Sequence, residues 1–397
     1  MMRDKRFTIA LNLLQNLVRA KSVTPPGDVS DSTNVVTNFL KSSGINFDIV
    51  EGKPGVKNVV AKLKGSKKSN NDTPLCLVMN GHIDTVPAGE GWEKQPFSGE
   101  FIDGEVWGRG SVDMKGGITA MLLALSEIKD EGSPFCGEII FTAVGDEEYH
   151  SQWGTKYLLA NGLNGDFAIN AEPTNLEFCL GNRGLLMVDI DIYGKASHGG
   201  RPHLGDNAVE KAAKIINAIN EMDFTEPSNS YFEVQNGSLS VVGIKGGSRE
   251  NVIPDLCTIY LDRRLMPGDS SDKAVKDILS LIKDTVGVDA DINDRKNSSI
   301  VVKPEFWHEP CWTEVEHPFI QNCIDVYDSK FGRNPEISGK AAGTDASHLV
   351  SIGKMPTLIF GPGNYNLSHT NKERIKFEQV LKAADFYKDL IKKVLHD

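Results

Sequence analysis

Hydrophobic and polar positions follow two patterns along the first 170 residues. Short apolar runs predict strands, most clearly at 58–63, 74–79, 138–144 and 167–170. A longer segment, 116–128, places its apolar residues at helical spacing and predicts a helix that packs one face on a sheet. Buried strands joined by helices are typical of an α/β sheet, so we expect one here.

A second pattern begins after the fourth of these strands. Strand-like and helical segments alternate closely there, at 185–193, 207–222, 238–242, 255–261 and 273–286. Toward the C-terminus the α/β pattern returns, with a buried strand at 357–360 and a closing helix. The sequence therefore predicts an α/β domain formed by residues 1–182 and 296–397, interrupted by an inserted α+β domain of residues 183–295.

Composition narrows the classes of function. The chain has 397 residues, with 43 Lys or Arg and 54 Asp or Glu, so its formal charge is −11. This acidic balance repels phosphate backbones and anionic lipids, so we expect neither a nucleic-acid partner nor a membrane partner. No apolar run approaches the roughly 20 residues that span a bilayer.

The first twenty residues and the cysteines indicate the compartment. Polar residues interrupt the apolar ones at helical spacing in residues 1–20, which predicts an amphipathic helix rather than a signal peptide. The six cysteines are widely spaced and form no CxxC pair, as expected for reduced thiols. We therefore expect a cytoplasmic protein.

Two histidines and five carboxylates directly follow predicted strands or begin the predicted helix: His82, Asp84, Asp113, Glu147, Glu148, Glu172 and His369. Ligands of α/β sheets bind at the carboxyl ends of the strands. Taken alone, a His-x-Asp triplet is more often structural, and an isolated Asp-Glu-Glu run is more often a solvated turn. Because several such positions accumulate along the chain, we interpret them as one site.

The number of carboxylates in this site points to metal ions. Gathered carboxylates repel one another unless cations neutralise them. Mixed histidine and carboxylate ligands suit Zn(II), Co(II) or Mn(II). One shared carboxylate can hold two such ions about 3.5 to 4 Å apart, an arrangement that activates water and polarises a carbonyl group. The sequence therefore predicts two divalent ions, with Zn(II) preferred over Co(II) or Mn(II).

A series of segments occurs in an order and spacing typical of one known family: GHIDTVP (81–87), GRGSVDMKGG (108–117), DEE (146–148), AEPT (171–174), GKASHGGRPHLGDNA (194–208), NVIPD (251–255), DRRLMPG (262–268), GTDASH (343–348), and FGPG with SHTNKE (360–373). Nearly the whole chain resembles the M20 family of metallopeptidases and amidohydrolases. That family contains acetylornithine deacetylase, succinyl-diaminopimelate desuccinylase, aminoacylase and carboxypeptidase G2. The resemblance implies a zinc-peptidase-like catalytic domain, with a mixed sheet flanked by helices, and an inserted lid or dimerisation domain.

The resemblance also implies a role for each candidate ligand. His82, Asp113 and Glu172 would hold one metal ion. Asp113, Glu148 and His369 would hold the other. Asp113 would therefore bridge the two ions.

Two further carboxylates would act beside these ligands. Asp84 would accept a hydrogen bond from the second ring nitrogen of His82 and so fix its tautomer. Glu147 would be the general base, which takes a proton from a metal-bridging water and delivers it to the leaving amine. Adjacent residues at a strand end point in different directions, so Glu147 and Glu148 can divide these tasks. In similar proteins the peptide bond corresponding to Asp113–Met114 is cis.

The resemblance assigns most substrate contacts to the inserted domain. His198, in GKASHGG, resembles the histidine that stabilises the oxyanion of the tetrahedral intermediate, often in the partner subunit, so we expect a homodimer through the lid domain. Further substrate-binding positions would be Arg183, Asn251, Arg263, Gly343 and Thr344. An arginine suits this task because its planar fork binds a carboxylate through two hydrogen bonds. For Arg263, a surface salt bridge is the alternative.

The implied reaction is hydrolysis of the amide bond of an N-acyl-L-amino acid, as in a deacetylase or desuccinylase of amino-acid biosynthesis. A di- or carboxypeptidase that uses the same metals is the alternative, and a non-catalytic binding protein on this fold is a third hypothesis. GNRG (181–184) and GTDASH differ from the motifs of the named activities, which leaves the acyl group open. Residues 149–153 depart from the shorter glycine-rich turn of similar proteins and are expected to reshape the pocket entrance.

Overall fold

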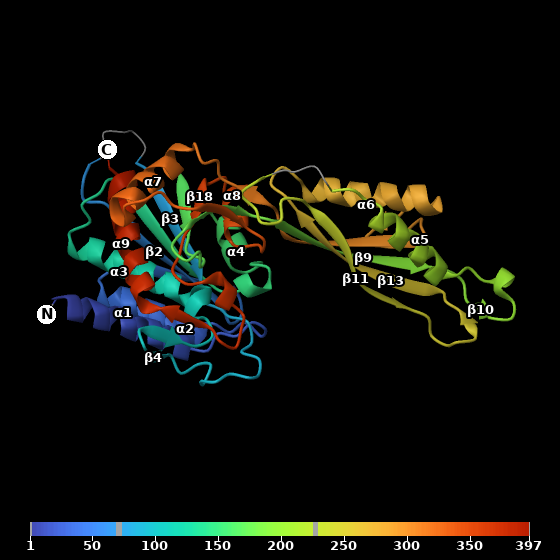
Figure 1. Ribbon diagram of the computed structural model, residues 1–397, viewed down its shortest axis with the longest axis horizontal. Helices are drawn as coiled ribbons and strands as arrows, with labels where there is room; N and C mark the ends of the chain where they lie inside the picture. Colours follow the sequence, from blue (N-terminus) through green and yellow to red (C-terminus); the bar gives the residue numbers. More distant parts are fainter. Residues whose placement is uncertain (1, 69–73, 225–228, 397) are drawn as a thin grey trace. The chain divides into compact units, whose positions relative to one another are not determined.

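A computed structural model describes residues 2–68, 74–224 and 229–396, and the chain folds into two compact units (Figure 1). Unit 1 contains the residues up to Gly181, Trp312–Gly339 and the residues from Thr344 onward. Unit 2 contains Asn182–Cys311 and Lys340–Gly343. The chain therefore leaves unit 1 after Gly181, returns at Trp312, and enters unit 2 once more at Lys340–Gly343.

A mixed β-sheet forms the centre of unit 1. β3 (Cys76–His82) pairs in parallel with both β6 (Glu138–Val144) and β7 (Phe167–Asn170), and β7 pairs in parallel with β18 (Thr357–Ile359). The remaining strands extend the sheet on both sides: β1 (Phe47–Lys53), β2 (Val56–Lys64), β8 (Phe178–Asn182), β16 (Cys311–Trp312) and β17 (Ile337–Lys340). Because parallel strands end at the same edge of a sheet, the residues that follow β3, β6, β7 and β18 lie close together.

Helices cover both faces of this sheet. Alternate side chains of a strand point to opposite faces. Leu77 and Met79 of β3 join the larger core, which contains residues of α1 (Met2–Arg19), α2 (Ser30–Ser42), α3 (Gly116–Asp130), α7 (Pro318–Phe331) and α9 (Phe377–Val394). Val78 joins a smaller core with α4 (Thr155–Ala160) and α8 (Ala346–Ser351). The predicted mixed α/β fold, with its sheet flanked by helices, is confirmed.

Short elements connect these layers near the carboxyl ends of the parallel strands. η1 (Ser111–Lys115) leads directly into α3, and η2 (Glu147–Tyr149) follows β6. η4 (Tyr365–Leu367) lies between β18 and a small sheet of β19 (Arg374–Lys376), β5 (Glu105–Trp107) and β4 (Glu100–Ile102). Asp113 therefore lies in η1, Glu147 and Glu148 lie in η2, and His369 follows η4.

Unit 2 is an antiparallel sheet with two helices on one face (Figure 1). Its main strands are β11 (Ser238–Gly246), β13 (Leu256–Leu265), β9 (Gly184–Tyr193), β15 (Ile300–His308) and β14 (Asp291–Ile292), in this order, and only β14 pairs in parallel. Apolar residues at alternate positions of β9 and β13 pack against α5 (Ala208–Asn220) and α6 (Ser271–Val286). Asn207 and Ser270 cap these helices by accepting hydrogen bonds from their first backbone N–H groups.

The boundary between the units differs from the predicted one at residue 295. β15 (Ile300–His308) pairs with β9 along most of its length, so it belongs to the sheet of unit 2. Pro304 lies inside this strand, where a proline normally argues against a strand. Among the described strands, β14 covers the other edge of β15 only at Val301 and Val302, so the edge at Pro304 tolerates the missing N–H group. Unit 2 therefore extends to Cys311.

Among the helices of the described residues, none is long and apolar enough to cross a membrane. All six cysteines lie in the described parts of the chain, and none forms a disulfide bond.

Candidate metal centre and active site

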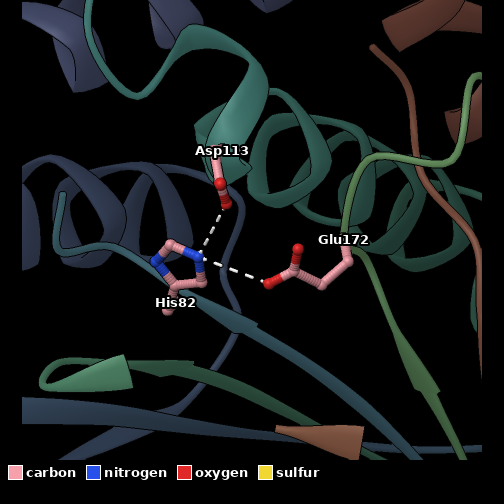
Figure 2. A group of neighbouring side chains, drawn as sticks. All are labelled: His82, Asp113 and Glu172. Carbon is pink, nitrogen blue, oxygen red and sulfur yellow. Dashed lines mark hydrogen bonds and ion pairs between the residues drawn. The ribbon is translucent and has the colours of Figure 1, made fainter. Parts of the chain in front are cut away.

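His82, the last residue of β3, is buried and lies between two carboxylates (Figure 2). Its Nε2 atom is 3.1 Å from Oδ1 of Asp113 and 3.5 Å from Oε1 of Glu172. Glu172 follows β7, which runs parallel to β3, and this pairing brings the two residues to the same sheet edge. A Cβ atom at Gly117 of α3 would lie 2.2 Å from the carbonyl oxygen of Ala171, so glycine permits the helix to approach this edge.

Asp113 lies between the two histidines. Its Oδ1 atom faces His82, and its Oδ2 atom is 3.3 Å from Nε2 of His369. The Asp113–Met114 peptide bond is cis, as the resemblance implies. The backbone N–H groups of Val112 and Asp113 donate to Oε1 of Glu373 at 3.0 and 3.2 Å.

Glu148 and His369 complete the other side of Asp113. Oε2 of Glu148 is 3.1 Å from Nε2 of His369, and Oε1 accepts a hydrogen bond from the N–H group of Val86 at 3.3 Å. His369 is more exposed than His82, with 52% of its side chain accessible against 1%. This side of the cluster is therefore the one that solvent reaches.

These side chains form two groups that share one residue. In the described parts of the chain, His82, Asp113 and Glu172 bring one ligand atom each within 4.8 Å of one another, and so do Asp113, Glu148 and His369. Zn(II) binds nitrogen and oxygen ligands at about 2.0 to 2.2 Å, so tetrahedral ligand atoms lie about 3.3 to 3.6 Å apart. The separations of 3.1 to 3.5 Å around the two histidines are close to this value. The donor set therefore fits a pair of divalent ions that share Asp113.

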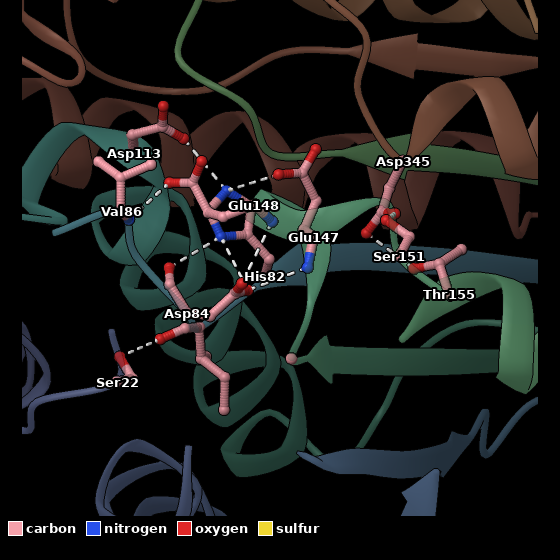
Figure 3. Close-up of polar contacts among 12 residues, drawn as sticks. Ser22, His82, Asp84, Val86, Asp113, Glu147, Glu148, Ser151, Thr155 and Asp345 are labelled. Atoms are coloured by element: carbon pink, nitrogen blue, oxygen red, sulfur yellow. Dashed lines mark hydrogen bonds and ion pairs between the residues drawn. The ribbon is translucent and has the colours of Figure 1, made fainter. Parts of the chain in front are cut away.

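Asp84 contacts this cluster through both its backbone and its side chain (Figure 3). Nδ1 of His82 lies 3.0 Å from the carbonyl oxygen of Asp84 but 3.5 Å from its Oδ1 atom. Because a carbonyl oxygen only accepts, Nδ1 carries a proton and donates it to Asp84, and Nε2 faces Asp113 and Glu172. The Asp84 carboxylate instead accepts the N–H groups of Glu147 and Glu148, each at 3.2 Å.

Glu147 belongs to neither group of ligand atoms. Its Oε2 atom is 3.9 Å from Nε2 of His82, and the side chain is largely buried. Burial raises the pKa of Glu147 well above its ordinary value, and the charges of Glu172 and Asp345 add to the effect. A buried carboxyl group with a raised pKa beside a cluster of ligands is suited to proton transfer.

The electrostatics of the cluster show how strongly it attracts positive charge. Burial by itself would lower the pKa of His82, but hydrogen bonds with Asp113, Asp84 and Glu172 raise it well above its ordinary value. Hydrogen bonds to Asp113 and Glu148 raise the pKa of His369 to about 10. The same carboxylates would favour divalent cations at this position.

Unit 2 places His198 beside Asn251. β10 (Ser197–His198) pairs with β12 (Val252–Ile253), and the carbonyl oxygen of Asn251 accepts the Gly199 N–H group at 2.7 Å. His198 is exposed, and its Nδ1 atom accepts the N–H group of Gly200 at 3.0 Å. In the neutral ring the proton is therefore on Nε2, which can donate to a ligand.

Arg263 lies on the face of β13 that the helices cover. Its side chain is only 9% exposed, its guanidinium group donates to the carbonyl oxygen of Arg264, and Nη2 lies 3.5 Å from Oδ2 of Asp269. It also lies over the ring of Phe224 and lines a cavity of about 330 Å³ within unit 2. The neighbouring Arg264 points to the opposite face, where it pairs with both carboxylate oxygens of Asp262. In this structure Arg263 is thus a buried arginine that forms an ion pair with the partly exposed Asp269, so the salt-bridge alternative is not removed.

The remaining predicted substrate contacts are divided between the units. In unit 2, Nη2 of Arg183 donates to the carbonyl oxygen of Asn236 at 3.0 Å. A Cβ atom at Gly343 would lie 2.3 Å from the ring of His308, so this position accepts no side chain without a shift. Thr344 belongs to unit 1, is buried, and accepts the N–H group of Ala346 at 3.2 Å.

The motif segments also contain two buried carboxylates whose function the sequence did not predict. Glu373, in SHTNKE, accepts the backbone N–H groups of Val112 and Asp113 and forms an ion pair with Arg109. Asp345, in GTDASH, accepts hydrogen bonds from Ser151 and Thr155. Their presence in the motifs was the only sequence feature that singled them out. Their partners are more than 180 residues away along the sequence, so motif spacing could not identify them.

Comparison with known proteins decides the family. The profile of peptidase family M20/M25/M40 matches residues 78–393. This chain belongs to that family. The predicted M20 membership is confirmed, and with it the assignment of the chain as a hydrolase of the amidohydrolase or peptidase type.

Relatives and solved structures agree with this M20 assignment. A succinyl-diaminopimelate desuccinylase of Methylorubrum extorquens is 28% identical over 393 residues, covering 95% of this chain and 96% of that protein. The structure of aminopeptidase PepT from Bacillus cereus is similar with a TM-score of 0.78 and 21% identity, covering 97% of this chain and 98% of that one. YXEP of Bacillus subtilis, a dinuclear metal binding peptidase from the M20 family, gives a TM-score of 0.73 at 15% identity and 99% coverage of both chains. The two structures show that the fold is shared.

Proposed function

We propose that this M20-family protein hydrolyses the amide bond of an N-acyl-L-amino acid, as a deacetylase or desuccinylase. The observation behind this proposal is the sharing of Asp113 between two groups of histidine and carboxylate ligands, with the buried Glu147 beside them. The similarity to a succinyl-diaminopimelate desuccinylase over nearly the whole chain supports an N-acyl amino acid as the substrate.

The ligand atoms of the two groups would hold two divalent ions. His82 and Glu172 would bind the first ion, His369 and Glu148 the second, and Asp113 both. Nitrogen and oxygen donors in this mixture suit Zn(II) first, with Co(II) or Mn(II) as substitutes. When bound, such a pair polarises a carbonyl group and lowers the pKa of water.

Glu147 would move the proton in this reaction. Its backbone N–H group is fixed by the Asp84 carboxylate, and its side chain lies outside both ligand groups. It would accept a proton from the attacking water and deliver it to the nitrogen of the leaving amine, so that a free amino acid and a carboxylate are released. Burial raises the pKa of Glu147 above its ordinary value, which suits a group that must both accept and donate a proton.

Unit 2 would supply most of the substrate contacts and the dimer interface. We assign His198 as the donor to the oxyanion, because its Nε2–H group is available for donation. Arg183, Asn251 and Arg263, together with Gly343 and Thr344, are proposed to surround the substrate. β11 is an edge strand with Val242 and Ile244 more than half exposed, which suits pairing with a second copy of the chain.

A di- or carboxypeptidase is the alternative on the same ligands, because the family includes peptidases as well as amidohydrolases. A non-catalytic binding protein would be expected to lose the base or the shared ligand, but Glu147 is present beside His82, and Asp113 lies beside His369.

The test is amine release by metal-stripped protein, with and without Zn(II) or Co(II), on N-acetyl-ornithine, N-succinyl-diaminopimelate, other N-acyl amino acids and several dipeptides. Metal-dependent hydrolysis of an acylated amino acid is the expected result. Cleavage of dipeptides alone would favour the peptidase, and no hydrolysis of any substrate with metal bound would contradict the proposal.

A further inference from the structure

A buried carboxylate lies beside the segment that holds Glu147 and Glu148 (Figure 3). Asp345 is 1% exposed, and its two oxygens accept hydrogen bonds from Oγ of Ser151 at 2.5 Å and Oγ1 of Thr155 at 2.8 Å. Both hydroxyl groups belong to fully buried residues. Hydrogen bonds to a buried charged group are among the stronger ones in proteins.

The segment that ends at Ser151 has an unfavourable backbone conformation. Asp146, His150 and Ser151 have φ angles of 72°, 77° and 53°, in the left-handed region that non-glycine residues rarely adopt. The short helix η2, with Glu147 and Glu148, lies between them. Such conformations persist only where the surrounding structure fixes them, so the contacts at both ends of this segment determine where the two glutamates lie.

Three sets of hydrogen bonds fix this segment. The Asp84 carboxylate accepts the N–H groups of Glu147 and Glu148 at its start. The carbonyl oxygen of Asp146 accepts the N–H group of Ser151 at 2.7 Å, which closes the segment on itself. Asp345 then holds the Ser151 side chain, and this contact anchors the end of the segment to the helix α8 of unit 1.

The same carboxylate connects the segment to the strand that ends in His82. Thr155, which donates to Asp345, also accepts a hydrogen bond from Nδ2 of Asn80 at 2.9 Å. Asn80 lies in β3, two residues before His82. One buried network thus joins the His82 strand, the end of the Glu147 segment and the start of α8.

We propose that Asp345 is a positioning residue, which holds Glu147 and Glu148 in their functional orientation through Ser151 and Thr155. The proposal rests on the proposed function, in which Glu147 moves the proton and Glu148 binds a metal ion. Asp345 acts through the two hydroxyl groups and not on the substrate. Its effect is expected on turnover rather than on substrate affinity, because the residues that bind the substrate are left in place.

The test compares variants that remove or keep the donors to Asp345. Ser151→Ala and Thr155→Val each remove one hydroxyl donor, whereas Thr155→Ser keeps it. Thr313→Val is the matched control, because it removes a buried hydroxyl that bonds to the backbone of Thr357, away from this network. We expect Ser151→Ala and Thr155→Val to lower kcat by about 10- to 100-fold with KM changed by less than about threefold, because small displacements of reacting groups have effects of this size. Thr155→Ser and Thr313→Val should retain kcat.

A second readout does not depend on activity. Metal-stripped protein is titrated with Co(II), and its visible absorption spectrum is recorded. Displacement of Glu148 should change the spectrum in Ser151→Ala and Thr155→Val but not in Thr155→Ser or Thr313→Val. If the wild-type protein hydrolyses none of the substrates, the proposed function fails, and this titration alone decides the role of Asp345.

Two results would overturn the proposal. The first is wild-type kcat and a wild-type Co(II) spectrum in both Ser151→Ala and Thr155→Val. The second is an equal loss of kcat in Thr313→Val, with a matching fall in Tm in all three variants. That outcome would assign Asp345 to stability alone.

Discussion

Replacing Glu147 with glutamine separates proton transfer from metal binding. Glutamine has nearly the same size and can keep the backbone contact with Asp84, since that contact uses the N–H group of residue 147. It cannot accept a proton as the carboxylate does. Because Glu147 lies outside both groups of ligand atoms, we expect the variant to bind two metal ions and lose turnover.

The expected loss of kcat in Glu147→Gln follows from the proposed role of Glu147 as the general base. A positioned general acid or base contributes about 10²- to 10⁴-fold to a rate, which corresponds to about 2.7 to 5.4 kcal/mol in the activation free energy. Oε2 of Glu147 lies 3.9 Å from Nε2 of His82, so this carboxylate is close to the proposed ligands without belonging to either group of ligand atoms. The decrease should therefore appear in kcat, with KM nearly unchanged.

Glu148→Gln is the matched control, because it makes the same chemical change at the adjacent residue. Glu148 lies 3.1 Å from Nε2 of His369 and belongs to the second group, so this variant should lose one ion per chain. Elemental analysis and steady-state kinetics on the same preparations distinguish the two effects. Glu147→Gln with more than about a tenth of wild-type kcat, or with the same metal loss as Glu148→Gln, would refute the assignment of Glu147 as the base.

Further predictions concern unit 2 and the surface of unit 1. His198→Ala should lower kcat by about 10²- to 10³-fold, the effect of losing one oxyanion donor, at unchanged metal content, and an unchanged kcat would exclude His198 from the mechanism. Wild-type protein should sediment as a dimer and Ile244→Lys as a monomer, because dimer formation through the edge strand β11 would bury the charge of the new lysine. A wild-type mass of one chain would contradict this. Burial raises the pKa of Cys76 to about 11 from its ordinary 9.0, so its alkylation by iodoacetamide at pH 8 should be about 100-fold slower than that of an unperturbed thiol, and an equal rate would contradict the burial argument.

The parts of the fold that could be predicted are those with strong local patterns. β6 and β7 have the predicted bounds, and α3 begins at the predicted residue, because each is a buried element with a clear apolar period. The predicted boundary of unit 2 was wrong because Pro304 interrupts the pattern of β15. Its position beyond the end of the short β14 makes the proline tolerable, and this depends on pairing that local sequence does not show.

The proximity of the proposed ligands could be predicted for a different reason. His82 ends one buried strand, and Glu148 and Glu172 follow two others, whose parallel pairing with it brings the three residues to one edge. The sequence did not distinguish which atom of Asp84 contacts His82, because the carbonyl oxygen at 3.0 Å and the carboxylate oxygen at 3.5 Å lie at similar distances from Nδ1. The resemblance selected Arg263, but only the strand register shows that its side chain lies on the face that the helices cover.

The measurement that tests the account most directly is a titration of metal-stripped protein with Zn(II), with amine release from the best substrate followed at each step. We expect no hydrolysis without metal and a maximal rate at two ions per chain, because Asp113 belongs to both groups of proposed ligands. Hydrolysis by the metal-free protein, or no hydrolysis of any acylated amino acid or dipeptide with two ions bound, would contradict it.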